Sequence, residues 1–96
     1  MIMLHIEHTV SDFDQWKASF DSFAELRQQT GVRRFVISRL LDRPDTVMID
    51  LEFDSLSQAQ TLLGTVQTVW QRVNGTLIND PQWRLSEVVE TRELQF

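Results

Sequence analysis

In two stretches of the chain, residues 2–7 and 46–53, every second residue is apolar and the residues between are mostly polar. One side of the alternation holds Ile2, Leu4, Ile6, Val47, Ile49, Leu51 and Phe53. The other side holds Met3, His5, Glu7, Met48, Asp50 and Glu52. Because successive side chains of a strand point to opposite faces of its sheet, both stretches are predicted strands. The sheet is expected to have one apolar core face and one mixed open face.

Two longer stretches repeat apolar residues at steps of three and four, which is typical of amphipathic helices. The first stripe comprises Phe13, Trp16, Phe20, Phe23 and Ala24. The second comprises Leu56, Ala59, Leu62, Leu63, Val66, Trp70 and Val73. Asp12 with Gln15, and Ser55 with Gln58, have the spacing of a capping box at the two helix starts. Gly31 predicts the end of the first helix near Thr30, since glycine readily takes the left-handed turn after a helix.

Two further strands complete the pattern. Residues 32–41 are rich in β-branched and aromatic types and are followed by the turn residues 42–45. Residues 76–81 are expected to form a loop, and residues 83–91 a fourth strand. The order β-α-β-β-α-β predicts an α+β, ferredoxin-like two-layer sandwich over residues 1–96, as a single domain. Its four-stranded antiparallel sheet would have the order 4-1-3-2, with both helices on one face.

The composition of the chain excludes several classes of function. The 96 residues carry a net charge of -5 and contain no cysteine. Acidic chains are poor partners for phosphate backbones, so we expect no nucleic-acid binding. Thiol catalysis and cysteine-ligated zinc are excluded. No stretch approaches the roughly 20 apolar residues of a membrane span and no targeting segment is evident, so we expect a cytoplasmic protein without membrane contact. A domain of this size gains stability by pairing, which favours a homodimer.

The candidate chemistry lies on the open face. His5 and Glu7 share that face, and Asp50 or Glu52 can lie across the strand pair from them. His8 is three residues from His5 and should point to the opposite face, so the two histidines are not expected to share a metal ion. The cluster could hold a divalent ion or a charged, proton-donating histidine. Alternatively, it lines a partly hydrated interface and pairs with arginines, for which the candidates are Arg34, Arg39 and Arg84.

The aromatic residues have two interpretations, as pocket wall or as core. Phe20 and Phe23 are expected in the core, whereas Phe13 and Trp16, near the helix start, are candidates for a pocket wall. Trp70 and Trp83 leave both interpretations open. A small basic group at the junction of the first helix and second strand would be solvated surface or a carboxylate clamp. It comprises Arg27, Arg33 and Arg34.

The chain resembles the dimeric α/β-barrel superfamily, which includes antibiotic-biosynthesis monooxygenase-like proteins. The resemblance rests on residues 13–17 (Phe-Asp-Gln-Trp-Lys), on residues 27–32 ending Gly-Val, on the turn 42–45, and on residues 52–59. It implies that two copies pack their open faces into a barrel. Members of this superfamily include cofactor-independent oxygenases, haem-degrading enzymes, decarboxylases and isomerases. Haem-degrading members use a histidine on the second helix, and this chain has none after His8.

Two hypotheses follow. In the first, a homodimer binds a small aromatic or polyketide-like molecule and acts as a monooxygenase-like enzyme without a cofactor or metal. His5 and Asp50 would be catalytic, with His5 moving a proton. The ligand would contact Glu7, Phe13, Trp16, Met48 and Glu52, in one pocket between the helices and the sheet. In the second hypothesis the protein is a non-catalytic dimerisation or ligand-sensing module.

Overall fold

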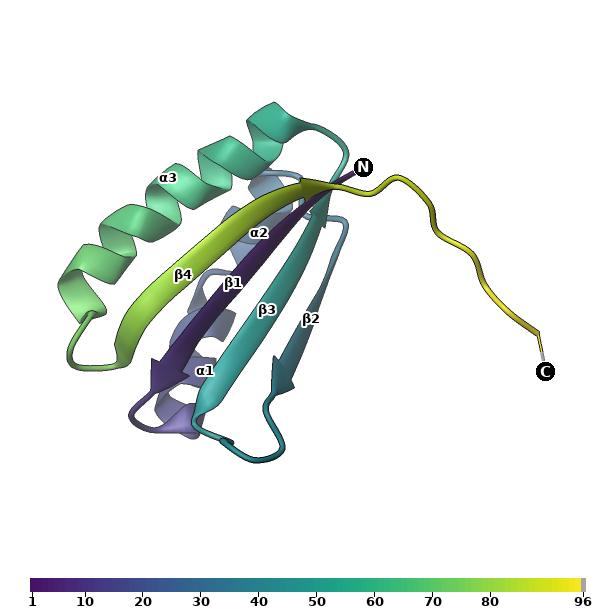
Figure 1. Cartoon of the computed structure of the whole chain (residues 1–96). Coiled ribbons are helices and arrows are strands. Elements are labelled where there is room, and N and C mark those ends of the chain that lie inside the picture. Colours follow the sequence, from purple (N-terminus) through teal and green to yellow (C-terminus); the bar gives the residue numbers. More distant parts are fainter. Residues whose placement is uncertain (96) are drawn as a thin grey trace.

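Four antiparallel strands form one sheet in the order β2-β3-β1-β4 (Figure 1), which confirms the predicted order. The strands of this computed structural model, which describes residues 1–95, are β1 (Ile2–Val10), β2 (Arg34–Arg39), β3 (Thr46–Phe53) and β4 (Ile78–Glu87). Strands β1 and β3 are central neighbours, in a register that pairs His5 with Asp50. On the other side of β1, Arg84 of β4 lies opposite His5. The predicted α+β, ferredoxin-like fold is confirmed.

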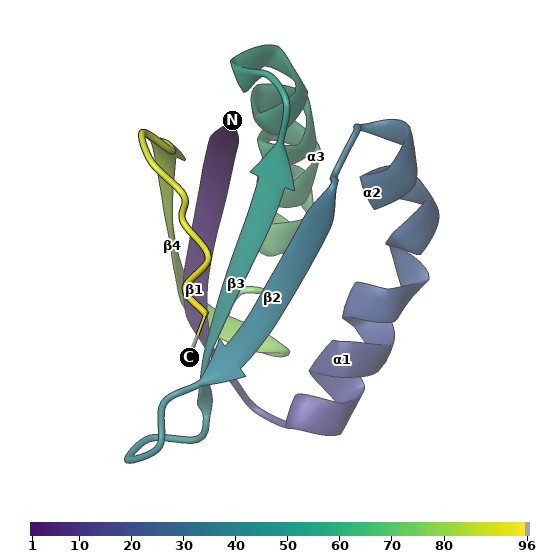
Figure 2. The same ribbon diagram turned by 90° about the vertical axis from the view of Figure 1, so that its right-hand side faces the viewer.

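The helices α1 (Phe13–Ser22), α2 (Ala24–Gln29) and α3 (Leu56–Val73) all cover the same face of the sheet (Figure 2). The core lies between these layers. Its buried apolar residues from the two central strands are Leu4, Ile6, Val10, Val47, Ile49, Leu51 and Phe53. The alternation in the sequence therefore identified the core face correctly. The helices leave the opposite face of the sheet uncovered.

The first predicted helix is two helices, because the chain breaks at Phe23. Its N–H donates to the Phe20 carbonyl at 3.1 Å, a tight turn that interrupts the regular helical bonding. Helix α2 ends next to Thr30, as predicted for the first helix of the sequence.

A glycine follows the end of this helix. Gly31 has φ +87°, and the Val32 N–H donates to the Arg27 carbonyl at 3.0 Å. With the Gly31 N–H bonded to the Gln28 carbonyl at 3.2 Å, this is a Schellman ending.

Helix α3 begins with the predicted capping box. The Ser55 hydroxyl accepts from the Gln58 N–H at 3.3 Å, and the Gln58 side chain accepts from the Ser55 N–H at 3.2 Å. These reciprocal bonds satisfy two backbone donors that a helix start otherwise leaves unpaired. Within α3, Gly64 faces open space, because a Cβ at this position would meet no atom within 4 Å.

Two strands have bounds that differ from those expected. Strand β2 is shorter than residues 32–41. Strand β4 begins at Ile78, within the predicted loop, and ends at Glu87 rather than near Thr91. The pairing of β1 with β4 shifts register between Glu7 and Thr9, where Asp80 has φ 54°. This bulge accommodates Pro81, which cannot donate to a sheet, so turn-forming residues lie within a strand.

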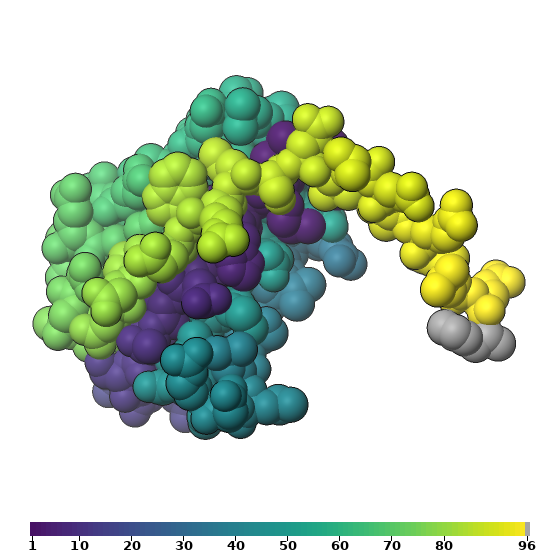
Figure 3. Space-filling model, in the orientation of Figure 1, coloured from purple at the N-terminus to yellow at the C-terminus, as the bar shows by residue number. Residues whose placement is uncertain are grey.

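Residues 88–95 leave the end of β4 and extend away from the sheet and helices (Figures 1 and 3). The Val88 N–H donates to the Met1 carbonyl at 2.9 Å. Beyond that bond, Val89 and Leu94 are 90% and 67% exposed. Among the described residues, no helix is long and apolar enough to cross a membrane.

Candidate functional site

A cavity of about 100 Å³ lies between the helices and the core face of the sheet. Strands β1 and β3 form its floor and the three helices its walls. Its lining is apolar except for three residues, His8, Ser19 and Arg27. A cavity of about 150 Å³ with apolar walls is known to hold benzene, so this smaller one encloses at most one aromatic ring, and the rest of a larger ligand would extend through its open side.

His8 is the histidine of the cavity floor. It is 4% exposed, on the same face of β1 as Leu4 and Ile6. Its Nδ1 lies 3.2 Å from the Thr9 carbonyl, which can only accept, so the hydrogen of the neutral ring is assigned to Nδ1. Burial lowers the pKa of His8, and the hydrogen bond to Thr9 offsets part of that effect. His8 is therefore a neutral imidazole at neutral pH, with Nε2 as its acceptor.

Aromatic rings form the wall opposite α3. Trp16 is 6% exposed and meets the His8 ring edge-on, with the ring centroids 5.6 Å apart. Phe20 continues the wall, 5.3 Å from Trp16 between centroids. Phe13 lies outside the cavity lining, where it contacts Trp16 at 5.7 Å and lies beneath the Arg39 guanidinium at 4.6 Å. Trp70 lines the cavity from α3, whereas Trp83 is 43% exposed.

Arg27 is the cationic residue of the cavity. It is on α2, just after the break at Phe23, and is 8% exposed. Its guanidinium carbon lies 3.8 Å from the centroid of the Phe20 ring and 5.1 Å from that of Phe35. The predicted basic group is dispersed, because Arg33 binds Asp54 at 3.1 Å and Arg34 binds Glu52 at 3.1 Å.

The residues predicted on the open face do come together there. His5 Nδ1 lies 2.8 Å from Asp50 Oδ1, and His5 Nε2 lies 3.8 Å from Glu7 Oε1. Met48 is the neighbour of Glu7 across the strand pair. The expected pairing of the acids with arginine is found at Glu52. Within residues 1–95, no three histidine or carboxylate side chains are grouped closely enough to hold a metal ion.

One part of the site prediction is wrong, because a single pocket does not hold both groups of residues. The open-face residues His5 and Asp50 alternate with core residues, so they point away from the helix layer to which Trp16 belongs. Phe13 belongs to the helix layer as well. The lining of the cavity thus includes Trp16 but none of the other residues predicted to be catalytic or ligand-binding.

Sequence reasoning did not place His8 or Arg27 in a cavity lining, although it named Arg27 within a basic group that could act as a carboxylate clamp. The signal for His8 was present, because the alternation that sends His5 to the open face sends His8 to the core face. Arg27 follows Phe20 by seven residues, which is two helical turns, and so continues the apolar stripe. Both residues interrupt apolar patterns, which marked them as polar groups on the core side of the sheet or helix.

Comparison with known proteins agrees with the fold. No family model and no curated relative matches the sequence. Among solved structures, a proposed antibiotic biosynthesis monooxygenase from Deinococcus radiodurans has a TM-score of 0.77 at 19% identity, over 100% of both chains. SnoaB of Streptomyces nogalater, a cofactor-independent oxygenase, has a TM-score of 0.74 at 14% identity, over 94% of both chains. A dimeric ferredoxin-like protein from an uncultured marine organism has a TM-score of 0.65 at 13% identity, covering 98% of this chain and 100% of the other. These similarities establish a shared fold.

Proposed function

We propose that the protein binds a small aromatic molecule in the cavity between its helices and its sheet, and oxidises it with molecular oxygen without a cofactor. The cavity carries this proposal. It is apolar, it has an aromatic wall, and it contains one neutral histidine. The similarity in fold to SnoaB, a cofactor-independent oxygenase, supports the proposal of oxygenase activity.

His8 is the proton acceptor in this proposal. Its Nε2 takes a proton from a CH2 group that neighbouring aryl or carbonyl groups acidify. The resulting carbanion transfers electrons to O2, and overall the CH2 group and O2 become a C=O group and water. The lowered pKa of His8 makes it a weak base that is free of its proton at neutral pH. The substrate must therefore be readily ionised and readily oxidised.

We also propose that two copies pair through the open face of the sheet. That face mixes ion pairs with apolar side chains, including Val36 of β2, which is 45% exposed. The likeness to a dimeric ferredoxin-like protein supports the pairing. Sedimentation is the direct test, and a stable monomer at micromolar concentration contradicts the proposal.

Binding is tested with a neutral aromatic probe, 1-naphthamide, by titration calorimetry and by the fluorescence of the cavity tryptophans Trp16 and Trp70. The variant Val66→Phe adds a ring on the cavity side of α3, while Thr65→Phe adds the same type of side chain at an exposed position of that helix. We expect Val66→Phe to abolish binding and Thr65→Phe to preserve it. Equal affinity in both variants would place binding outside the cavity.

Turnover is tested by oxygen consumption with anthrone, in which a CH2 group and a carbonyl group each join the same two aryl rings. We expect consumption above the rate without protein, and loss of that excess in His8→Gln. If the protein binds aromatic probes but consumes oxygen with none of the oxidisable ones, it is a ligand-sensing module. That is the second hypothesis from the sequence.

A further inference from the structure

We infer that Arg27 recognises an anionic group on the ligand, and that the ligand class is an aromatic carboxylate. The inference deepens the proposed function, on which it rests, by naming the substrate class of the same cavity. It follows from the position, the partners and the charge environment of this one side chain.

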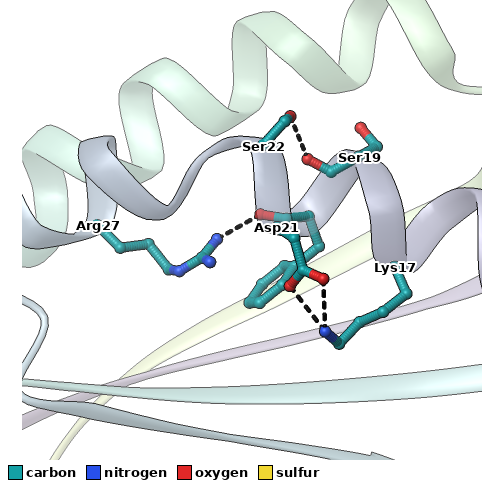
Figure 4. Close-up of polar contacts among 6 residues, drawn as sticks. Lys17, Ser19, Asp21, Ser22 and Arg27 are labelled. Atoms are coloured by element: carbon teal, nitrogen blue, oxygen red, sulfur yellow. Dashed lines mark hydrogen bonds and ion pairs between the residues drawn. The ribbon is translucent and has the colours of Figure 1, made fainter.

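Arg27 is held in place without a carboxylate partner. Its Nη1 donates to the Phe20 carbonyl at 2.6 Å. The nearby carboxylate of Asp21 binds Lys17 instead, with its two oxygens 2.7 and 2.8 Å from Nζ (Figure 4). Within residues 1–95, no carboxylate oxygen lies within ion-pair distance of the Arg27 guanidinium.

Such a site is costly to maintain in the folded chain. A buried cation loses hydration, and one carbonyl with two ring faces restores only part of that loss. Burial accordingly lowers the pKa of Arg27, and Asp21 opposes this effect. The guanidinium remains charged, because arginine begins from a pKa far above neutral. A bound carboxylate would supply a counter-charge in direct contact with the guanidinium, which no side chain of the described residues provides.

The remaining donors of Arg27 are available to a ligand. A guanidinium has five N–H groups, and the structure gives one of its nitrogens a hydrogen-bond partner. No fully buried side-chain nitrogen or oxygen of the described residues lacks a partner, so the other guanidinium nitrogens, which have none, keep some accessible surface. Arg27 lines the cavity, and planar guanidinium groups bind carboxylates through two parallel bonds.

The rest of the cavity favours an aromatic body for that carboxylate. Its other ionisable group is His8, which is neutral, and its walls are apolar. An anionic group is therefore directed to Arg27, while the ring system packs against Trp16 and Phe20. The arrangement orients the ligand with its charge at α2 and its ring over the floor at β1.

The alternative is that Arg27 only fixes the break between α1 and α2 through the Phe20 carbonyl. A matched pair of probes separates the two roles. 1-Naphthoate and 1-naphthamide have nearly the same shape, and at neutral pH only the former carries a negative charge. A structural role of Arg27 affects both affinities alike, whereas recognition affects the naphthoate alone.

The experiment compares the dissociation constants of both probes, by titration calorimetry, for the unmodified protein, Arg27→Met and Arg39→Met. Arg39 is the control, because it also lies over a phenylalanine ring but outside the cavity lining. We expect the unmodified protein and Arg39→Met to prefer naphthoate by about tenfold or more. We expect Arg27→Met to lose that preference, with its naphthamide affinity unchanged within about twofold.

Equal binding of both probes by the unmodified protein would overturn this inference and leave the proposed cavity site intact. That comparison needs no variant, so it holds even if Arg27→Met fails to fold. Equal weakening of both probes in Arg27→Met would assign Arg27 the structural role. Failure of both probes to bind the unmodified protein would overturn the proposed binding function together with this inference.

Discussion

His5 Nδ1 lies 2.8 Å from Asp50 Oδ1 on the face of the sheet that no helix covers. The two side chains are direct neighbours across β1 and β3 and are each about one-third exposed, at 33% and 37%. They point away from the cavity, on the surface through which we propose that two copies pair. The pair is therefore placed to contribute to association.

We predict that Asp50→Asn weakens the dimer by roughly tenfold, because it removes the charge that His5 binds in a surface that pairing would desolvate. Sedimentation over a concentration series measures the change. The control is Asp54→Asn, whose carboxylate pairs with Arg33 at a site where both side chains are more than 60% exposed. Such exposed pairs contribute little, so we expect no shift in the control.

A further variant, His5→Ala, tests the catalytic role predicted for His5 and its partner Asp50. We expect His5→Ala to leave the naphthamide affinity of the dimer unchanged, since the cavity lies on the other face of the sheet. Loss of anthrone oxidation in His5→Ala dimers would instead support the catalytic prediction, and would require that the two faces communicate.

We predict that His8 makes the fold less stable in acid. Burial lowers the pKa of His8 below its ordinary value of 6.5, so the unfolded chain binds the proton more tightly. The contribution of His8 is fully present above that value, and it is lost as the pH falls from 6.5 toward the folded-state pKa. Urea denaturation at a series of pH values measures the slope. In His8→Leu the slope over this window should decrease, and an unchanged slope would mean that His8 is protonated equally in both states.

The open-face residues could be predicted from sequence because apolar residues recur so regularly in two strands. In β1 and β3 every second residue is apolar, so the chain itself identifies the two faces, and adjacency of the strands then brings His5 to Asp50. The break at Phe23 could not be predicted, because the stripe of apolar residues runs through it without interruption, while in the structure the Phe20 carbonyl accepts from both the Phe23 N–H and the Arg27 guanidinium. The cavity was equally hidden, since its volume depends on how closely α1 and α3 approach the sheet.

Gly31 should tolerate no larger residue. Its φ of +87° disfavours any side chain, and a Cβ would lie 2.5 Å from Gln58 Nε2 in the capping box of α3. We predict that Gly31→Ala destabilises the protein by about 1 to 2 kcal/mol from the backbone alone, and further by displacing Gln58. Gly75→Ala is the matched control, with φ +90° and no atom within 4 Å. If Gly75→Ala loses less stability than Gly31→Ala, the difference measures the contribution of Gln58. Equal losses of stability in the two variants would show that the Gln58 side chain moves aside freely.

At Gly64, in contrast to Gly31, we expect alanine to stabilise the protein. It lies on an exposed part of α3, its φ is not positive, and a Cβ would meet open space. Because glycine in a helix interior costs about 1 kcal/mol relative to alanine, we predict that Gly64→Ala stabilises the protein by about that amount. The midpoint of urea unfolding checks the prediction, with the slope of the transition unchanged. A destabilised Gly64→Ala variant would mean that another molecule approaches α3 closely at this position. In that case the helix layer, as well as the open face of the sheet, would belong to an interface.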